Sequence, residues 1–159
     1  MHAHSHSADL DEVASSRLQQ ADQRYTPLRR KLIGLLASAD QPMTLPEILT
    51  EMQGAAMSSA YRNLAVLERA GLVVRIVAGD GFAHFELAEE FTQHHHHLVC
   101  TSCGEVSDVE LSETVERVLH DSTASVAATS GFSMMTHRLD IIGICRECAP
   151  DGTESGPQL

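Results

Sequence analysis

The sequence lacks the features that mark several classes of protein. No apolar run approaches the roughly 18 residues of a membrane helix, so we expect no membrane span. Ten glycines and four cysteines in 159 residues exclude a collagen and a disulfide-rich mini-protein. No basic stretch followed by an apolar segment stands near the first residue, so we expect the chain to stay in the cytoplasm. Cysteines in that compartment are metal ligands more often than disulfide partners.

Several motifs of enzymes are also missing. The sequence has no glycine-rich phosphate loop, no His-Glu-x-x-His and no Gly-x-Ser-x-Gly. His84-Phe85-Glu86 fits the His-x-Glu of zinc deaminases, but Val99 stands where that pattern needs a proline before Cys100. We therefore predict neither enzymatic activity nor a small-molecule substrate.

The charge of the chain is unevenly distributed. A net charge of −11 argues against a nucleic-acid partner. Residues 17–75, however, carry eight basic and five acidic residues, whereas the chain from Gly81 onward carries three basic and thirteen acidic ones. Seven of the ten histidines lie in this acidic part, between His84 and His137. The sequence is thus a basic front half joined to an acidic half that is rich in histidine and cysteine.

The front half has the pattern of a winged helix-turn-helix. We expect residues 1–8 to be a disordered tail and residues 9–88 to form the domain. Apolar spacing and caps, such as Thr26 before Pro27 and Thr44 three residues before Glu47, predict helices and then two strands. The expected helices cover 9–23, 27–40, 44–54 and 58–70, and the expected strands, joined by a turn at 78–81, cover 72–77 and 82–87.

The last of these helices would lie in the DNA major groove. Its apolar residues share one face, and Ser59 and Arg62 lie on the opposite face. Arg24 and Arg29 stand at the start of the second helix, where phosphate contacts would fall. A merely solvated polar face is the alternative for such arginines.

The four cysteines form two Cys-x-x-Cys pairs. Cys100 and Cys103 make the first pair, and Cys145 and Cys148 make the second. Two such turns supply the four sulfurs of a tetrahedral structural zinc site. Because 41 residues separate the pairs, the domain that holds them must fold back on itself. A redox pair or unrelated core cysteines are the alternatives.

A tract of four histidines precedes the first cysteine pair. In a strand, His95 and His97 would share one side and His94 and His96 the other, so the tract can supply two metal sites. His84 would share a strand face with Glu86. A helix over 111–130 would bury a stripe that includes Leu111, Val115, Val118, Leu119, Ser122 and Val126, and would leave Glu113, Glu116, Arg117 and His120 outside. A last strand over 134–144 would carry His137.

These elements predict an α+β protein. A small α/β dimerisation domain over 89–150, with the four-cysteine zinc site, would follow the winged helix, and residues 151–159 would be a disordered tail.

The combined motifs resemble those of the ferric uptake regulator family of bacterial metal-dependent repressors. The resemblance covers roughly Arg24 to Cys148. Its matching segments are Tyr25-Thr26-Pro27-Leu28-Arg29, Ser59-Ala60-Tyr61-Arg62-Asn63-Leu64, Ala70-Gly71-Leu72-Val73, His94 to Cys103, Gly131-Phe132, His137 and Ile141 to Cys148. Membership implies a homodimer that represses metal-homeostasis genes by binding a palindromic operator in double-stranded DNA.

The resemblance also implies roles for individual residues. Structural zinc would be held by Cys100, Cys103, Cys145 and Cys148. A regulatory metal would be held by Glu86, His95 and His97, with His84 as fourth ligand, and a second metal by His94, His96, Glu116 and His137. DNA would be contacted by Tyr61 and Arg62, beside Arg24, Thr26, Arg29 and Ser59.

The sensed metal is left open by the sequence. Residues 41–44 hold no histidine, which iron-sensing members often have there, and residues 88–91 hold no cysteine, which one zinc-sensing branch has. Zn²⁺, Fe²⁺ and Mn²⁺ are the candidates. The alternatives to a metal-activated repressor are a cytoplasmic zinc buffer or metallochaperone and a peroxide-sensing member of the same family.

Overall fold

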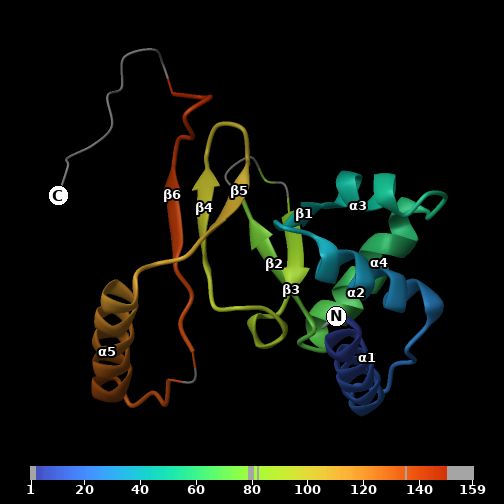
Figure 1. Ribbon diagram of the computed structural model, residues 1–159, viewed down its shortest axis with the longest axis horizontal. Coiled ribbons are helices and arrows are strands. Elements are labelled where there is room, and N and C mark those ends of the chain that lie inside the picture. Colours follow the sequence, from blue (N-terminus) through green and yellow to red (C-terminus); the bar gives the residue numbers. More distant parts are fainter. Residues whose placement is uncertain (1–2, 79–80, 82, 135, 150–159) are drawn as a thin grey trace.

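The computed structural model describes residues 3–78, 81, 83–134 and 136–149 (Figure 1). The front half holds four helices and a three-stranded sheet, and the back half holds a second three-stranded sheet and one long helix. No helix in the part of the chain that the structure describes is long and apolar enough to cross a membrane. The expected C-terminal tail, residues 151–159, lies outside the described residues.

Four helices make up most of the front half: α1 (Ala3–Gln20), α2 (Pro27–Ser38), α3 (Leu45–Glu51) and α4 (Met57–Arg69). The predicted caps are present. Thr26 accepts from the backbone N–H of Arg29 at 3.4 Å, and Thr44 and Glu47 form a reciprocal capping box. These caps set where α2 and α3 begin, because they bind N–H groups that have no partner within the helix.

The first helix differs from the prediction at both ends. It begins at Ala3, within the expected disordered tail, and it ends at Gln20 instead of continuing to Gln23. Residues 3–8 contain neither proline nor glycine, so each residue added to an existing helix gains a backbone hydrogen bond. Ala14 and Leu18 of α1 are fully buried in the front-half core.

The wing is confirmed and is one strand larger than predicted. β2 (Val73–Val77) pairs antiparallel with β3 (Ala83–Leu87), which also pairs with β1 (Met43–Thr44). A two-residue strand is too short to show an alternating pattern, so β1 was missed. Gly79 and Asp80 of the predicted turn and Phe82 of the predicted second strand lie outside the described residues. The core beneath the sheet includes Leu32, Ile48, Leu64, Leu67 and Phe85.

The back half is built on β4 (His96–Cys100). β5 (Val106–Val109) pairs with it antiparallel on one side, and β6 (Asp140–Gly143) pairs with it parallel on the other. The predicted strand over 134–144 is therefore shorter than expected. The ladder starts with Asp140 opposite His97, and just before it the backbone N–H of His97 donates to the carbonyl oxygen of Leu139 at 3.2 Å. The single turn η1 (Glu89–Phe91) connects the two halves.

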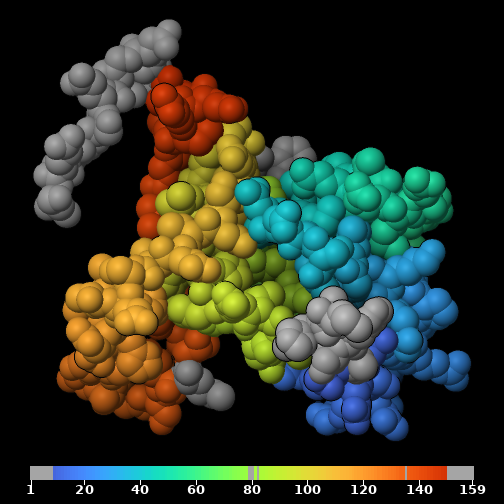
Figure 2. Space-filling model, in the orientation of Figure 1, coloured from blue at the N-terminus to red at the C-terminus, as the bar shows by residue number. Residues whose placement is uncertain are grey.

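The helix α5 (Glu113–Thr129) forms where predicted, but its predicted inner face is wrong. Val115, Val118 and Val126 are 50%, 59% and 67% exposed, and Glu116 is directed toward the histidine tract instead. The helix stands at the far side of the molecule from α1–α4, as Figures 1 and 2 show. Its apolar stripe is left uncovered because no other described element of the chain packs over it.

Candidate metal centres

The four cysteines meet at one end of the back-half sheet. Cys100 ends β4 opposite Gly143 of β6, so the two Cys-x-x-Cys turns leave neighbouring parallel strands at the same edge. The four sulfurs lie within 4.8 Å of one another, and the backbone N–H of Cys145 donates to Sγ of Cys100 at 3.3 Å. This topology brings together two turns that are far apart in the sequence.

The cysteine group has the dimensions and chemistry of a zinc site. A tetrahedral centre with Zn–S bonds of about 2.3 Å places its sulfurs about 3.8 Å apart, and Sγ of Cys103 and Cys145 are 3.7 Å apart. Backbone hydrogen bonds from Cys103 and Cys145 lower the pKa of the Cys100 thiol to about 6. The thiolate, which is the metal-binding form, is therefore favoured at Cys100.

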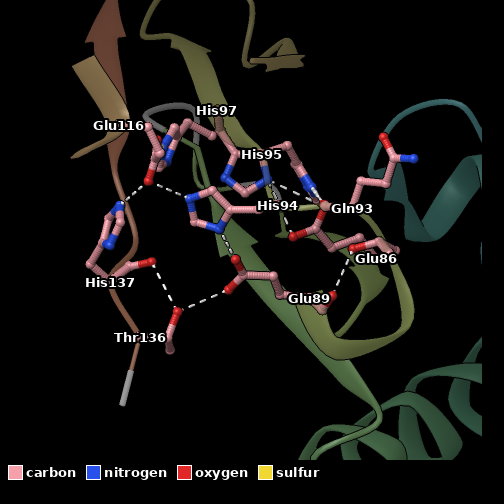
Figure 3. Close-up of polar contacts among 11 residues, drawn as sticks. Glu86, Glu89, Gln93, His94, His95, His97, Glu116, Thr136 and His137 are labelled. Carbon is pink, nitrogen blue, oxygen red and sulfur yellow. Dashed lines mark hydrogen bonds and ion pairs between the residues drawn. The ribbon is translucent and has the colours of Figure 1, made fainter. Parts of the chain in front are cut away.

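A second group of ligand-type side chains spans the junction of the two halves. It comprises Glu86 of β3, His95 before β4, His97 of β4 and Asp108 of β5. The two carboxylate oxygens of Glu86 lie 3.1 Å from Nε2 of His95 and 3.2 Å from Nε2 of His97. Asp108 is farther away, at 3.9 Å from Nε2 of His95. Figure 3 shows His95 directed toward Glu86 from the segment that follows Gln93.

The remaining ring nitrogens of this group have partners of their own. Nδ1 of His97 lies 3.0 Å from a carboxylate oxygen of Asp140, and Nδ1 of His95 lies 2.8 Å from the carbonyl oxygen of Gln93. Such outer contacts orient metal-binding imidazoles toward the ion. The residues present therefore fit a divalent metal held by two imidazoles and two carboxylates.

The surroundings of Glu86 favour the charged form of its carboxylate. Burial raises the pKa of Glu86, but hydrogen bonds and charge interactions with His97 and His95 lower it more. Burial lowers the pKa of His97, but Glu86 and Asp140 raise it above its usual value. The contacts of Glu86 with His95 and His97 thus connect the two halves in this structure.

His84, the fourth ligand implied by the resemblance, does not join this group. Its side chain is 6% exposed and lines a cavity of about 390 Å³ with Glu47, Cys103 and Glu105. The fourth ligand-type side chain that lies with Glu86, His95 and His97 is that of Asp108. The sequence offered an acidic residue in β5 as a signal, but the antiparallel register that sets Asp108 opposite His97 is a tertiary property.

The third group is the one expected for a second metal: His94, His96, Glu116 and His137. Glu116 of α5 is its centre (Figure 3). The oxygens of Glu116 lie 2.8 Å from Nε2 of His94, 2.9 Å from Nε2 of His96 and 2.9 Å from Nε2 of His137. Three imidazoles and one carboxylate fit Zn²⁺ or Fe²⁺.

Three of the expected DNA-binding residues are exposed, and the other three are half-buried or buried. Tyr61 and Arg62 are exposed on α4, with Tyr61 at 48%, and Arg24 is exposed before α2, whereas Ser59 is half-buried. These positions are compatible with DNA contacts. Thr26 acts as the cap of α2.

Arg29 has a different position from the one we expected. It is 9% exposed, and its guanidinium donates to Oδ1 of Asn63 at 2.9 Å, to the carbonyl oxygen of Arg24 at 2.5 Å and to Gln23 at 3.0 Å. Arg29 therefore ties α2 to α4. The burial of Arg29 could not be predicted from the sequence, because a buried arginine needs hydrogen-bond partners and only the fold shows which residues supply them.

Comparison with known proteins identifies the family. The model of the ferric uptake regulator family matches residues 20–142. The chain therefore belongs to this family of metal-responsive transcriptional repressors, whose members bind DNA and act as dimers.

Individual relatives agree with this assignment. The peroxide-responsive repressor PerR of Staphylococcus aureus (strain USA300) is 29% identical over 146 residues, which cover 88% of this chain and 91% of that protein. The structure of the ferric uptake regulator from Pseudomonas aeruginosa with manganese is 28% identical, has a TM-score of 0.65 and covers 82% of this chain and 96% of its own. A zinc uptake regulator in complex with zinc and DNA is 25% identical, with a TM-score of 0.53 and coverages of 89% and 94%.

Proposed function

We propose that this chain is a metal-activated repressor whose regulatory ion binds Glu86, His95, His97 and Asp108. The observation that supports the proposal is that these ligands come from both halves of the chain. Glu86 lies on a strand of the winged-helix sheet, whereas His97 and Asp108 lie on strands of the back-half sheet. An ion bound by all of them would hold the two halves in one relative orientation.

The ligand set explains how metal would control DNA binding. A ligand shifts a conformational equilibrium only by its difference in affinity for the two states. Ligands from two bodies provide that difference, because the complete set exists only when the halves are correctly placed. If DNA binds the protein in the same orientation, bound metal raises the affinity for DNA, and bound DNA raises the affinity for metal by the same factor.

The DNA-binding surface would be the exposed face of α4. Tyr61 and Arg62 would enter the major groove, with Tyr61 contacting bases and Arg62 contacting backbone or bases. Arg24 and the helix start at Thr26 would meet phosphates, and Ser59 would lie at the edge of the contact. The positive charge of residues 17–75 supports this assignment over a solvated surface.

The uncovered face of α5 supports a homodimer. Val115, Val118 and Val126 of α5 are 50%, 59% and 67% exposed, and several apolar side chains exposed on one helix face mark an interaction site. A dimer with two-fold symmetry presents two α4 helices and reads a palindromic operator. We place this activity in the cytoplasm, where the cysteine group is reduced.

The metals follow from the donor atoms. Zn²⁺ would hold the four-cysteine group together as a structural ion. The regulatory group accepts Zn²⁺, Fe²⁺ or Mn²⁺, and the affinity order does not choose among them. A peroxide-sensing role is not favoured, because the solved structures that resemble the chain include iron, manganese and zinc uptake regulators.

The decisive experiment separates a repressor from a zinc buffer. DNA duplexes would be selected from a random pool with the purified protein in the presence of Zn²⁺, Fe²⁺ or Mn²⁺, and binding would then be measured with each metal and with chelator. We expect sequence-specific binding that needs metal. The variant Arg62→Ala should keep its metal content and lose about 10- to 100-fold in DNA affinity.

Two results would overturn the proposal. One is metal-independent binding with no preference for sequence. The other is a failure to select any duplex, which would favour the buffer; unchanged DNA affinity in Arg62→Ala would place the DNA contact away from this face of α4. The matched control is Arg117→Ala, because Arg117 is an exposed arginine on α5.

A further inference from the structure

Arg17, in the last turn of α1, contacts both the turn that follows α4 and the connection between the two halves. Its guanidinium donates to the carbonyl oxygen of Gly71, directly after α4, at 2.8 Å. It also forms a two-point ion pair with Glu90 of η1, in which Nη1 lies 2.5 Å from Oε1. The ring of Phe91 lies beneath the guanidinium, 5.2 Å away. One side chain thus joins three segments that are distant in the sequence.

The helix that carries Arg17 is itself firmly attached to the front half. Ala14 and Leu18, on either side of Arg17, are fully buried in the core. Earlier in α1, Asp11 accepts a hydrogen bond from the hydroxyl of Tyr25 and forms an ion pair of 3.2 Å with Arg30. The backbone of Arg17 is therefore held in place by the core, so binding of Glu90 to its guanidinium restrains η1 relative to the front half.

The turn η1 is held from the other side by the histidine group. Glu89, next to Glu90, contacts Nδ1 of His94 and accepts a hydrogen bond from Thr136 at 3.1 Å. The other ring nitrogen of His94 lies 2.8 Å from Glu116 (Figure 3). Two consecutive acidic residues thus connect η1 to opposite halves of the molecule.

We propose that Arg17 is a positioning residue that links the His94–His96–Glu116–His137 group, through Glu89 and Glu90 of η1, to the end of the recognition helix at Gly71. A metal bound by His94 and Glu116 would fix the ring that Glu89 contacts. Glu90, in the same turn, would then hold Arg17 and the end of α4 in the DNA-binding arrangement. This inference rests on the proposed function and assigns a role to the second metal group.

The contacts are stronger than those of an ordinary surface ion pair. Isolated exposed ion pairs contribute little to stability, but a two-point arginine–carboxylate pair with a further carbonyl and an aromatic contact restricts the guanidinium in several directions. Arg17 also lies outside residues 20–142, the part that the family model matches. Gly71, Glu89 and Glu90, the residues that it links, lie within that part.

The test measures how much Zn²⁺ improves DNA binding in the full-length wild-type protein and four full-length variants. The probe is a duplex selected from a random pool with the zinc-loaded wild-type protein, and the measured quantity is the ratio of Kd without zinc to Kd with zinc. We expect Arg17→Gln and Glu90→Gln each to reduce this ratio by about tenfold. The double variant should lose no more than either single variant, because both break the same link. Arg117→Gln, which removes an exposed arginine elsewhere, should leave the ratio within about twofold.

A second comparison tests the connection to the histidine group. Glu116→Gln removes the central ligand of that group, so adding Arg17→Gln to it should cause no further loss. Zinc content at the four cysteines should be the same in all variants. An unchanged ratio in Arg17→Gln, or losses from Arg17→Gln and Glu116→Gln that simply add in free energy, would overturn the link.

A measurement without DNA keeps this inference separate from the proposed function. Amide hydrogen exchange at Gly71 and Leu72 should slow when Zn²⁺ binds the wild-type protein and should slow less in Arg17→Gln and in Glu116→Gln. If the wild type shows this slowing but no zinc-dependent DNA binding, the proposed function fails and the link stands. Equal slowing in wild type and Arg17→Gln rejects the link whatever the DNA result.

Discussion

Cys100 and Gly143 are partners in the parallel ladder between β4 and β6. Both strands end at this level, and each is followed by a Cys-x-x-Cys turn. The backbone N–H of Thr101 donates to the carbonyl oxygen of Gly143 at 2.8 Å, which fixes the two turns against each other. The zinc ligands and the sheet are therefore parts of one structure, and neither is expected to persist well without the other.

Loss of one zinc ligand should destabilise the back half. We expect Cys100→Ser to lose the structural zinc and to lower the melting temperature by about 10 °C, which corresponds to roughly 4 kcal/mol for a chain of this size. Metal content and thermal unfolding measure the two effects. Ser102→Ala, an exposed position within the same turn, is the control and should change neither. Retention of a full equivalent of zinc in Cys100→Ser would contradict a four-cysteine site.

Replacing Asp108 and replacing His84 should have different effects on the Zn²⁺ affinity of the regulatory group. Asp108→Asn should weaken Zn²⁺ binding by about 10- to 100-fold, since its carboxylate belongs to the group. His84→Gln should change the affinity by less than about twofold, because its ring lies in a neighbouring cavity. Competition with a chelating dye measures both, in a Glu116→Gln background that removes the second group.

The reverse order of these two effects would restore His84 as the fourth ligand. Equal losses in both variants would instead indicate that either change disturbs the packing of β3 against the back half. Thermal unfolding of the metal-free variants distinguishes that disturbance from the loss of a ligand.

Two arginines near the start of α2 should behave differently. Arg29→Ala should lower the free energy of unfolding by about 2 to 3 kcal/mol, because it removes a buried side chain and leaves half-buried partners such as Asn63 without their charged donor. Arg24→Ala should change stability by less than about 0.5 kcal/mol and reduce the salt dependence of DNA binding by about one counterion. Urea unfolding and a salt series of DNA affinities are the measurements. A stable Arg29→Ala protein with weakened DNA binding would return Arg29 to the DNA surface.

The exposed stripe of α5 should be the dimer interface. Val118→Glu places an unpaired carboxylate in that interface and should weaken dimerisation by at least about 100-fold, since burying such a charge costs several kcal/mol. Sedimentation velocity across a concentration series measures the monomer–dimer equilibrium. Ala37→Glu, at an exposed position of α2, is the matched control and should remain as dimeric as the wild type. A dimeric Val118→Glu protein would place the interface elsewhere.

Much of the fold was predictable because the relevant signals are local. The capping box at Thr44 and Glu47 and the proline after Thr26 mark helix starts through contacts within one turn. The wing hairpin follows from two alternating runs, and the spacing of each Cys-x-x-Cys pair is itself the geometry of a zinc turn. The alternation of His94–His97 along one strand likewise separates the ligands of two groups before any tertiary contact is known.

The errors have a common physical origin, since they concern residues whose role depends on a distant partner. Arg29 was expected on the surface, and its burial depends on Asn63 of another helix. The apolar stripe of α5 was expected inside because periodicity identifies an apolar face but does not say whether the same chain covers it.

The sequence by itself determined the helix starts, the wing, the cysteine pairs and the two-sided histidine tract, because each depends on residues within a few positions of one another. Tertiary structure alone decided that Asp108 joins Glu86 while His84 does not, and that Arg17 reaches Gly71 and Glu90. Those outcomes depend on strand register and on how helices pack, which are set by the burial of the whole core and not by the residues at the site.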